Sequence, residues 1–258
     1  MVRKNNGEEL TGLTLRGESN ICPNIYLNAF YDLHQEGMKI EDTMGQIGEI
    51  FQREINRMPQ FNLEDFTYNN MKDNLYYTVI NAEKNEKLLQ EIPHQRREDL
   101  AIVYRVHLSV SDEGTGSILL NNTHLKLWGV DQNEVHSQAV LNMPKILPYA
   151  FENMNDIIAE MMGADLEEFE EMAGENMMWV LSNDKRMQGA AYMFDEEVMS
   201  SIAEKLGGDF IVLPSSLHEV IILKEEENMD LEHIHGMVSE VNESQVEPDE
   251  VLSDAIYR

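Results

Sequence analysis

The stretch LAIVYRVHLSVSDEGTGSILLNNTHLKLW, residues 100–128, decides the fold of this chain. Residues 100–110 and 117–128 are rich in Val, Ile, Leu and Tyr, which suit strands. Between them, residues 112–116 read DEGTG, which is the composition of a turn. The pattern therefore predicts a long antiparallel hairpin, which we place at the centre of the molecule.

The sequence on the N-terminal side of this central hairpin predicts further strands and helices. Residues 10–16 and 25–30 read as a second hairpin, and apolar residues that step by three or four over 40–58 indicate an amphipathic helix. A short strand is expected at 75–80. We therefore expect an N-terminal α+β lobe over residues 1–163, with the central hairpin as its main strands.

The remainder of the chain predicts a second lobe with a different order of elements. Residues 164–176 are strongly acidic and form either a linker or an acidic face. Residues 177–258 predict a β-β-α-β-β-α lobe, with strands at 178–181, 189–194, 209–213 and 218–223 and helices at 195–206 and 229–241. Eleven acidic residues and one base follow Lys224, so we expect an acidic tail with a solvated end. The predicted fold class is α+β, with two packed lobes built from antiparallel hairpins and amphipathic helices.

The net charge of the chain limits the kinds of macromolecule that it can bind. The chain has 48 acidic and 19 basic residues, a formal net charge of −29. Phosphate backbones and anionic headgroups need a basic surface, so we expect no direct binding to nucleic acid and none to a membrane. The single cysteine, Cys22, can form neither an intramolecular disulfide nor a Cys-rich zinc site. Without an apolar signal segment either, the sequence predicts a cytoplasmic protein.

The acidic stretch supplies one candidate interaction surface. Its carboxylates have no balancing Lys or Arg and could bind a basic protein; an ordinary solvated acidic face is the alternative. The residues of this candidate acidic interaction face are Asp165, Glu167, Glu168, Glu170, Glu171 and Glu175.

A second candidate site is a ligand pocket between the two lobes. Ser215, Ser216, His218 and Glu219 include the residue types of a hydrolase triad, but they follow a proline in a hairpin rather than a nucleophile elbow. The candidate pocket residues are Asn20, Asn24, Ser215, Ser216, His218 and Glu219. Histidines scattered along the chain lack a metal-binding spacing. We therefore assign no catalytic residue, metal ligand or cofactor from the sequence.

Four longer stretches, at residues 10–31, 127–148, 178–194 and 202–223, together resemble a known family. The most specific part is GGDFIVLPSSLHE, residues 207–219. The chain resembles a bacterial family catalogued as a domain of unknown function, number 5688, found in Clostridia and relatives. The resemblance implies a cytoplasmic α+β protein without an assigned reaction, cofactor or catalytic residue. It also implies a helical segment upstream of the first hairpin in other members, whereas this chain begins almost at the strand.

Three hypotheses of function follow from the sequence. The first is a non-enzymatic binding or regulatory protein whose acidic surface binds a basic protein. The alternative is an enzyme of unrecognised type with an interlobe pocket near His218 and Glu219. A third is a homo-oligomer that assembles through the edge of a hairpin.

Overall fold

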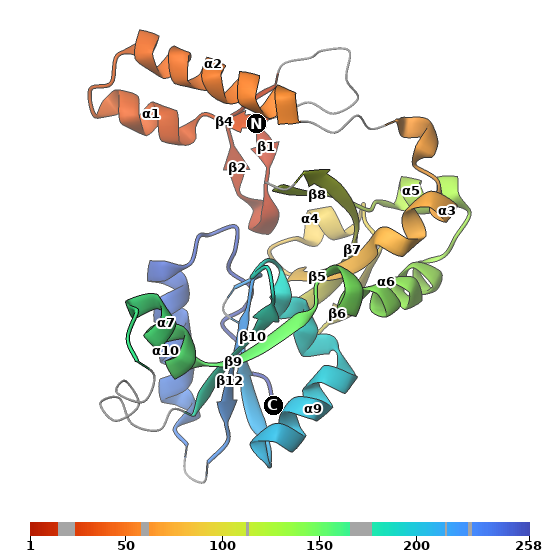
Figure 1. The fold of residues 1–258 in the computed structure, drawn as a ribbon, viewed down its shortest axis with the longest axis vertical. Coiled ribbons are helices and arrows are strands. Elements are labelled where there is room, and N and C mark those ends of the chain that lie inside the picture. Colours follow the sequence, from red (N-terminus) through yellow and green to blue (C-terminus); the bar gives the residue numbers. More distant parts are fainter. Residues whose placement is uncertain (15–23, 58–61, 112–113, 166–176, 215, 227–228) are drawn as a thin grey trace.

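The computed structural model describes residues 1–14, 24–57, 62–111, 114–165, 177–214, 216–226 and 229–258 (Figure 1). It confirms the α+β class, because antiparallel sheets and several helices make up the described chain. The helices are α1 Asn28–Gln35, α2 Ile40–Arg57, α3 Tyr68–Met71, α4 Glu86–Leu89, α5 Asn122–Trp128, α6 Gln132–Ile146, α7 Met154–Met162, α9 Glu196–Leu206 and α10 Leu231–Gln245. Short 3-10 helices are η1 Asn5–Gly7, η2 Leu63–Asp65, η3 Lys72–Asn74 and η4 Gly189–Phe194.

The first sheet is organised around the predicted central hairpin. Its longest strand, β7 (Leu100–Ser111), pairs along one edge with β5 (Leu75–Asn81). Along its other edge it pairs first with β6 (His94–Arg97) and then with β8 (Gly114–Leu119). The hairpin is confirmed, but its second strand ends at Leu119 because Asn121 caps the helix α5.

The second sheet has the strand order β11-β12-β10-β9, and every pairing in it is antiparallel. Its strands are β9 (Tyr149–Asn153), β10 (Met178–Asn183), β11 (Phe210–Leu213) and β12 (Val220–Lys224). β9 precedes the expected lobe boundary at residue 163, yet it pairs with β10. Strand pairing therefore joins residues from both sides of the expected boundary in one sheet.

One predicted strand of the second lobe is wrong. Residues 189–194 form the 3-10 helix η4, so the lobe does not have the β-β-α-β-β-α order. The reason is a close approach of backbones: a Cβ on Gly189 would lie 2.5 Å from Ser182 Oγ and 2.8 Å from the Asn183 nitrogen. The chain turns back against β10 at this point and cannot extend as a strand beside it.

A single core joins the two sheets. Tyr77 and Tyr104 of the first sheet belong to the same buried cluster as Leu181 and Ile222 of the second. η4 lies between the sheets and contacts both β5 and β10. The Tyr192 hydroxyl of η4 donates to the Leu147 carbonyl at 2.5 Å, so even the polar atom of this buried ring is paired. The two sheets therefore share one hydrophobic core.

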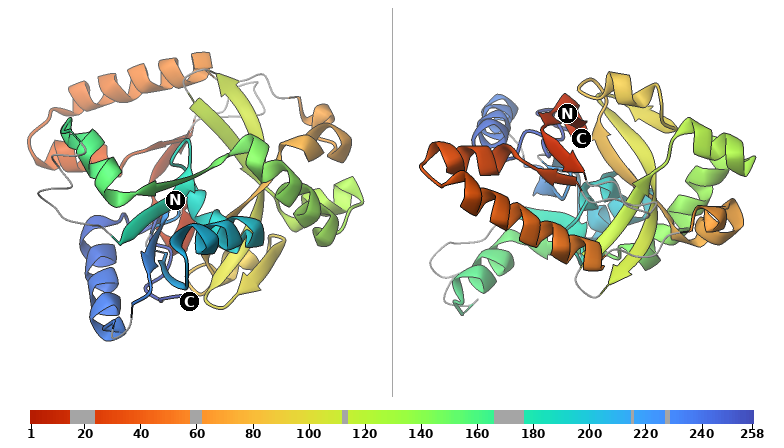
Figure 2. Two further views of the ribbon diagram at one scale, coloured as in Figure 1. Left: turned by 60° about the horizontal axis from the view of Figure 1, so that its bottom comes forward. Right: turned by 90° about the horizontal axis from the view of Figure 1, so that it is seen from above.

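The two faces of the first sheet are covered differently. All seven residues of β5 are buried, so both faces of this strand need a cover. The helix α6 packs on one face. In the right-hand view of Figure 2 the N-terminal strand lies on one side of the yellow strands and the green helices α5 and α6 on the other. The face opposite α6 carries a smaller buried cluster formed by Ile80, Ala82, Leu89, Ile92, Ala101 and Val103.

The two ends of the described chain close the structure. The N-terminal strand β1 (Val2–Arg3) pairs with β2 (Glu9–Leu10), and η1 lies between them. At the other end Leu252 is fully buried, and Ser253 and Tyr257 donate hydrogen bonds to the Asp99 carboxylate. The expected solvated end of the tail is therefore wrong, because buried apolar and hydrogen-bonded groups hold it against the first sheet.

A smaller unit stands beside the two lobes. The strands β3 (Gly12–Thr14) and β4 (Asn24–Tyr26) pair as the hairpin predicted from residues 10–16 and 25–30, but the second strand ends at Tyr26 because the helix α1 begins at Asn28. α2 confirms the predicted helix, and its Ile47 and Phe51 bury against Ile25 of β4. In Figure 1 the helices α1 and α2 lie at the end of the molecule, away from the second sheet.

Gly189→Ala tests the close approach of η4 to β10. The added methyl would overlap the backbone of Ser182 and Asn183, so we expect the free energy of unfolding to fall by about 1–3 kcal/mol, as in overpacked cores. Gly208→Ala is the matched control, because no atom lies within 4 Å of its Cβ position. Urea unfolding of both variants measures the difference. Equal stability of the two variants would contradict this packing.

Candidate functional site

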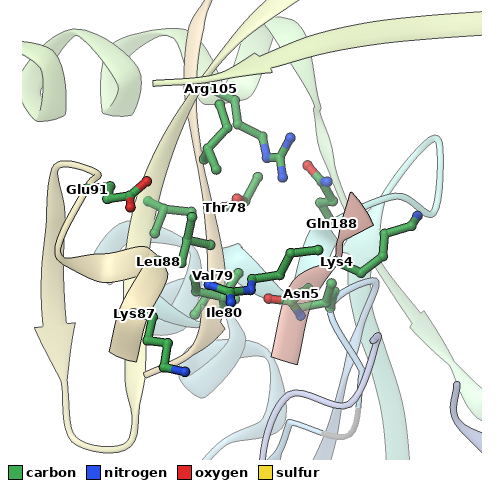
Figure 3. Close-up of a pocket in the computed structure, with 14 residues that line it drawn as sticks. Lys4, Asn5, Thr78, Val79, Ile80, Lys87, Leu88, Glu91, Arg105 and Gln188 are labelled. Atoms are coloured by element: carbon green, nitrogen blue, oxygen red, sulfur yellow. The ribbon is translucent and has the colours of Figure 1, made fainter. Parts of the chain in front are cut away.

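A pocket of about 470 Å³ lies on the face of the first sheet opposite α6 (Figure 3). Its floor is formed by the two central strands. Thr78 of β5 and Val103 of β7 are partners in register, so their side chains share this face, and Arg105 lies two residues further along β7. The full lining consists of Arg3, Lys4, Asn5, Thr78, Val79, Ile80, Lys87, Leu88, Glu91, Val103, Arg105, Leu119, Gln188 and Leu217.

The walls of the pocket come from three distant parts of the chain. Lys87, Leu88 and Glu91 come from α4 and the turn after it. The N-terminal segment supplies Arg3, Lys4 and Asn5, and the second lobe supplies Gln188 and Leu217. The pocket is therefore an interlobe site, whose shape depends on how the lobes and the N-terminal segment pack.

The charge of the lining is opposite to that of the protein. Lys and Arg are 19 of 258 residues, roughly one in fourteen, yet four of the 14 lining residues are basic. Glu91 is the single acidic residue in this lining. Two of the cations have nearby carboxylates: Arg3 lies 3.8 Å from Glu9, and Lys4 lies 3.8 Å from Asp249. Among the described residues, no carboxylate forms a salt bridge with Lys87 or Arg105.

Arg105 is the most constrained of these cations. Its Cα partners are Tyr76 on β5 and Leu119 on β8, so its stem is held within the sheet. Nη1 donates to Ser117 Oγ at 3.1 Å, whereas Nε is buried and has no hydrogen-bond partner in the described part of the chain. Burial lowers the pKa of the guanidinium, and the nearby Tyr76 opposes this shift. Arginine stays charged in proteins, so the pocket is lined by a half-buried positive charge with no carboxylate partner among the described residues.

Asn5, another residue of the pocket lining, has a hydrogen-bond acceptor without a partner among the described residues. Its Nδ2 donates to the Asp249 carbonyl at 2.8 Å, and its Oδ1 is buried without a hydrogen-bond partner among the described residues. The next residue, Asn6, has a left-handed φ of 58° and is locked to Asn85, whose Oδ1 accepts from the Asn6 backbone at 3.0 Å. The segment that presents Asn5 is thus attached both to the first sheet and to the C-terminal end.

A small cavity of about 50 Å³ adjoins the main pocket at Gln188. The Tyr76 hydroxyl donates to Gln188 Oε1 at 3.4 Å, which leaves the Gln188 amide N–H groups as donors. His107 also lines this cavity, and burial together with the positive charge of Lys185 lowers its pKa. We therefore expect this imidazole to be neutral at pH 7.

A larger groove of about 1050 Å³ lies between α6, α9 and β11. Its charged residues are mixed, with Arg97 opposed by Asp195, Glu196 and Glu197, and Arg258 pairs with Glu225. In the described part of this groove every buried side-chain polar atom has a partner. The pocket of about 470 Å³ therefore gives a stronger indication of a ligand than this groove does.

The structure places the predicted pocket residues beside this site rather than in it. Ser216 is buried, and its Oγ accepts from the backbones of His218 at 3.1 Å and Glu219 at 3.4 Å. His218 Nδ1 accepts from the Gln188 backbone at 3.3 Å, and Nε2 lies 3.1 Å from Glu250 Oε1. Leu217, between them, does line the pocket. The hairpin thus contributes its apolar residue, while its polar groups stabilise the turn.

The other predicted site residues are apart from this pocket or outside the described residues. Asn24 is exposed on β4 and accepts a hydrogen bond from the Thr14 hydroxyl. Asn20 and Ser215 lie outside the described residues. So do most of the acidic interaction face, namely Glu167, Glu168, Glu170, Glu171 and Glu175, whereas Asp165 is described and exposed.

Sequence reasoning missed the basic residues of the pocket. Arg105 gave a signal, because strand alternation puts it on the same face as Ala101 and Val103, among apolar residues. Lys87 and Lys4 gave none, since each is an ordinary polar residue of its own segment.

Over the described residues, no group of three His, Cys, Asp or Glu side chains is placed to hold a metal ion. Nor does any described helix have the length and apolar character needed to cross a membrane.

Comparison with known proteins gives a family for this chain. The model of a family described as "Family of unknown function (DUF5688)" matches residues 1–258, the whole sequence. The chain belongs to DUF5688. No curated protein and no solved structure matches this DUF5688 chain. The resemblance found in the sequence is confirmed, and the case for a function of this DUF5688 member rests on its pocket.

Arg105→Met tests whether the half-buried guanidinium serves a ligand rather than the fold. Methionine keeps the apolar stem and removes a buried donor without a partner, which costs about 1–3 kcal/mol. We therefore expect the free energy of unfolding to rise by about 1 kcal/mol, as at other functional positions that reduce stability. Arg53→Met, on the exposed surface of α2, is the matched control and should change stability by less than about 0.5 kcal/mol. A clear loss of stability in Arg105→Met would instead make Arg105 a structural residue.

Proposed function

We propose that this chain is a non-enzymatic binding protein whose pocket binds a small organic anion. The observation that carries the proposal is the half-buried guanidinium of Arg105, which lines the cavity and forms no salt bridge with a described carboxylate. A guanidinium carries five N–H donors, so one that lines a cavity without a carboxylate partner leaves donors for a group supplied from outside. An anionic oxygen is the best partner for a guanidinium donor.

The lining also favours a ligand with an apolar portion. Val103, Leu119, Leu88 and Leu217 surround the polar groups with aliphatic side chains. A volume of about 470 Å³ falls in the range of sites for small organic molecules. An apolar wall also lowers the local dielectric constant, which strengthens the interaction of Arg105 with an anion.

The overall negative charge does not prevent such binding. At physiological ionic strength the Debye length is about 8 Å, so carboxylates on distant surfaces are largely screened from the pocket. Short-range contacts with Arg105 and Lys87 then decide the affinity. The total charge of −29 instead disfavours large polyanions, which would meet the acidic surface around the pocket.

The other functional hypotheses remain predictions. For an enzyme near His218 and Glu219, the pocket offers Thr78 and Glu91 as polar groups on its wall, with His218 behind Gln188. For a basic protein partner, exposed carboxylates on α2 and α10, such as Glu41, Glu49 and Glu240, add to the acidic surface. Charge reversal at Asp165 should weaken capture of such a basic protein if that second proposal holds.

Thermal stabilisation by a panel of small anions tests the anion proposal. The panel contains aliphatic and aromatic carboxylates, inorganic phosphate, phosphate monoesters, and the neutral amide of each carboxylate. We expect at least one class of anion to stabilise the protein by about 2.7 kcal/mol at a concentration of about 100 Kd, and its neutral counterpart to have no effect.

The same panel on two variants shows where the anion binds. Loss of a charge-assisted hydrogen bond should weaken binding to Arg105→Met by about tenfold to a hundredfold, whereas Arg53→Met should bind as the unaltered protein does. Unfolding does not explain that loss, because Arg105→Met is expected to be the more stable protein. If no anion binds, or if Arg105→Met binds equally well, the proposed function is wrong.

A further inference from the structure

The main pocket and the small cavity beside it lie along one face of the first sheet. Arg105 and His107 alternate to the same side of β7, and their register partners on β8 are Leu119 and Ser117. Arg105 and Leu119 line the pocket of about 470 Å³, whereas His107 and Ser117 line the cavity of about 50 Å³. Arg105 Nη1 donates to Ser117 Oγ at 3.1 Å, on the wall of the small cavity. The guanidinium therefore lies where the two cavities meet.

The guanidinium of Arg105 keeps an accessible donor at this junction. Nε is the one nitrogen of this side chain among the buried unpaired atoms of the described chain. Nη1 is paired with Ser117. Nη2 has no hydrogen-bond partner in the described part of the chain and is not one of its buried unpaired atoms, so it remains accessible. The Nη2 amino group is thus the donor that a ligand can reach.

Gln188 supplies a second donor, because it lines both cavities. The Tyr76 hydroxyl pairs with Oε1, so Nε2 carries the free N–H groups. The backbone of Gln188 has a left-handed φ of 57°, which is costly for a residue other than glycine, and its N–H donates to His218 Nδ1 at 3.3 Å. In Figure 3 the Gln188 side chain and the guanidinium of Arg105 point toward each other. The two donors therefore converge at the junction of the cavities.

Lys185 adds a positive charge to the lining of the small cavity. It is exposed, and no described carboxylate forms a salt bridge with it. Its charge reaches the cavity, since burial and then the charge of Lys185 lower the pKa of His107. The described lining of this cavity contains neither Asp nor Glu. An anionic group at the junction therefore meets the charges of both Arg105 and Lys185.

We propose that the anionic group of the ligand is a phosphoryl group at this junction, and that the ligand is a phosphate monoester of a small organic alcohol. A carboxylate has two coplanar oxygens, which one guanidinium can pair. A phosphoryl group has three acceptor oxygens and a charge of about −1.5 to −2 at pH 7, so it suits donors and cations from several elements. Arg105 comes from β7, whereas Lys185 and Gln188 come from the second lobe.

The sizes of the two cavities assign the parts of the ligand. A cavity of about 50 Å³ has room for only a few water-sized groups, so it takes phosphoryl oxygens and no chain or ring. The pocket of about 470 Å³, with its aliphatic wall, takes the organic portion. This inference rests on the proposed binding of an organic anion.

Titration calorimetry with the full chain at about pH 8 tests the inference. The ligands are two organic groups, phenyl and hexyl, each as a phosphate monoester, a sulfate monoester and a carboxylate, together with inorganic phosphate. The phosphate monoester is a dianion at this pH because its second pKa is about 6, and the sulfate monoester has the same shape with one charge fewer. We expect at least one phosphate monoester to bind about tenfold more tightly than its sulfate and carboxylate counterparts and than inorganic phosphate.

Lys185→Met adds an independent measurement. It should remove the preference for the phosphate monoester over the sulfate and leave carboxylate binding nearly unchanged, because Arg105 remains. Lys39→Met, which replaces an exposed lysine outside both linings, is the matched control and should keep the preference.

Three results would overturn the inference: no preference for a phosphate monoester, a preference that survives in Lys185→Met, or inorganic phosphate that binds as tightly as the esters. In each case Arg105-dependent binding of the carboxylates or sulfates would leave the proposed function standing. If none of these anions binds, both proposals fail.

Discussion

The structure depends on covering both faces of one strongly apolar sheet. Every residue of β5 is buried, and so are residues 100–104 and Val106 of β7 beside it, so both faces of these strands need a cover. The helix α6 packs on one face, and the 3-10 helix η4 also contacts β5. The other face is covered by α4, the N-terminal segment and two residues of the second lobe, which do not fill it completely. The candidate site is the space that remains, and Arg105 on β7 places a charge within it.

The same constraint explains why the ends of the chain belong to the fold. Asp99, in the turn between β6 and β7, accepts hydrogen bonds from Ser253 and Tyr257, and Asn5 donates to the Asp249 backbone. The C-terminal segment thus fixes the N-terminal segment, which in turn forms one wall of the pocket. Burial and the adjacent Asp99 carboxylate both raise the pKa of Tyr257, so its hydroxyl remains a neutral donor in this contact. A site that depends on segments so far apart in sequence requires the whole chain.

Local patterns in the sequence predicted the elements better than the site. The hairpin around residues 112–116 and the helix α2 follow from turn composition and apolar spacing, which act between near neighbours. The strand predicted at 189–194 failed because contact between Gly189 and β10, outside the local pattern, decides its conformation. The pocket brings together residues from Arg3 to Leu217, and only tertiary packing puts them in contact. His218 drew attention as a titratable residue, yet its neighbour Leu217 is the one that lines the cavity.

The central claim is that the Arg105 guanidinium binds an anion inside this pocket, and anomalous diffraction from crystals soaked in iodide tests it most directly. Iodide is a monoanion that accepts hydrogen bonds and is located independently of any assumed ligand. We predict an ordered iodide within hydrogen-bonding distance of the Arg105 guanidinium, and its absence from the same position in Arg105→Met crystals. Ordered iodide elsewhere on the protein, with none beside Arg105, would contradict the account.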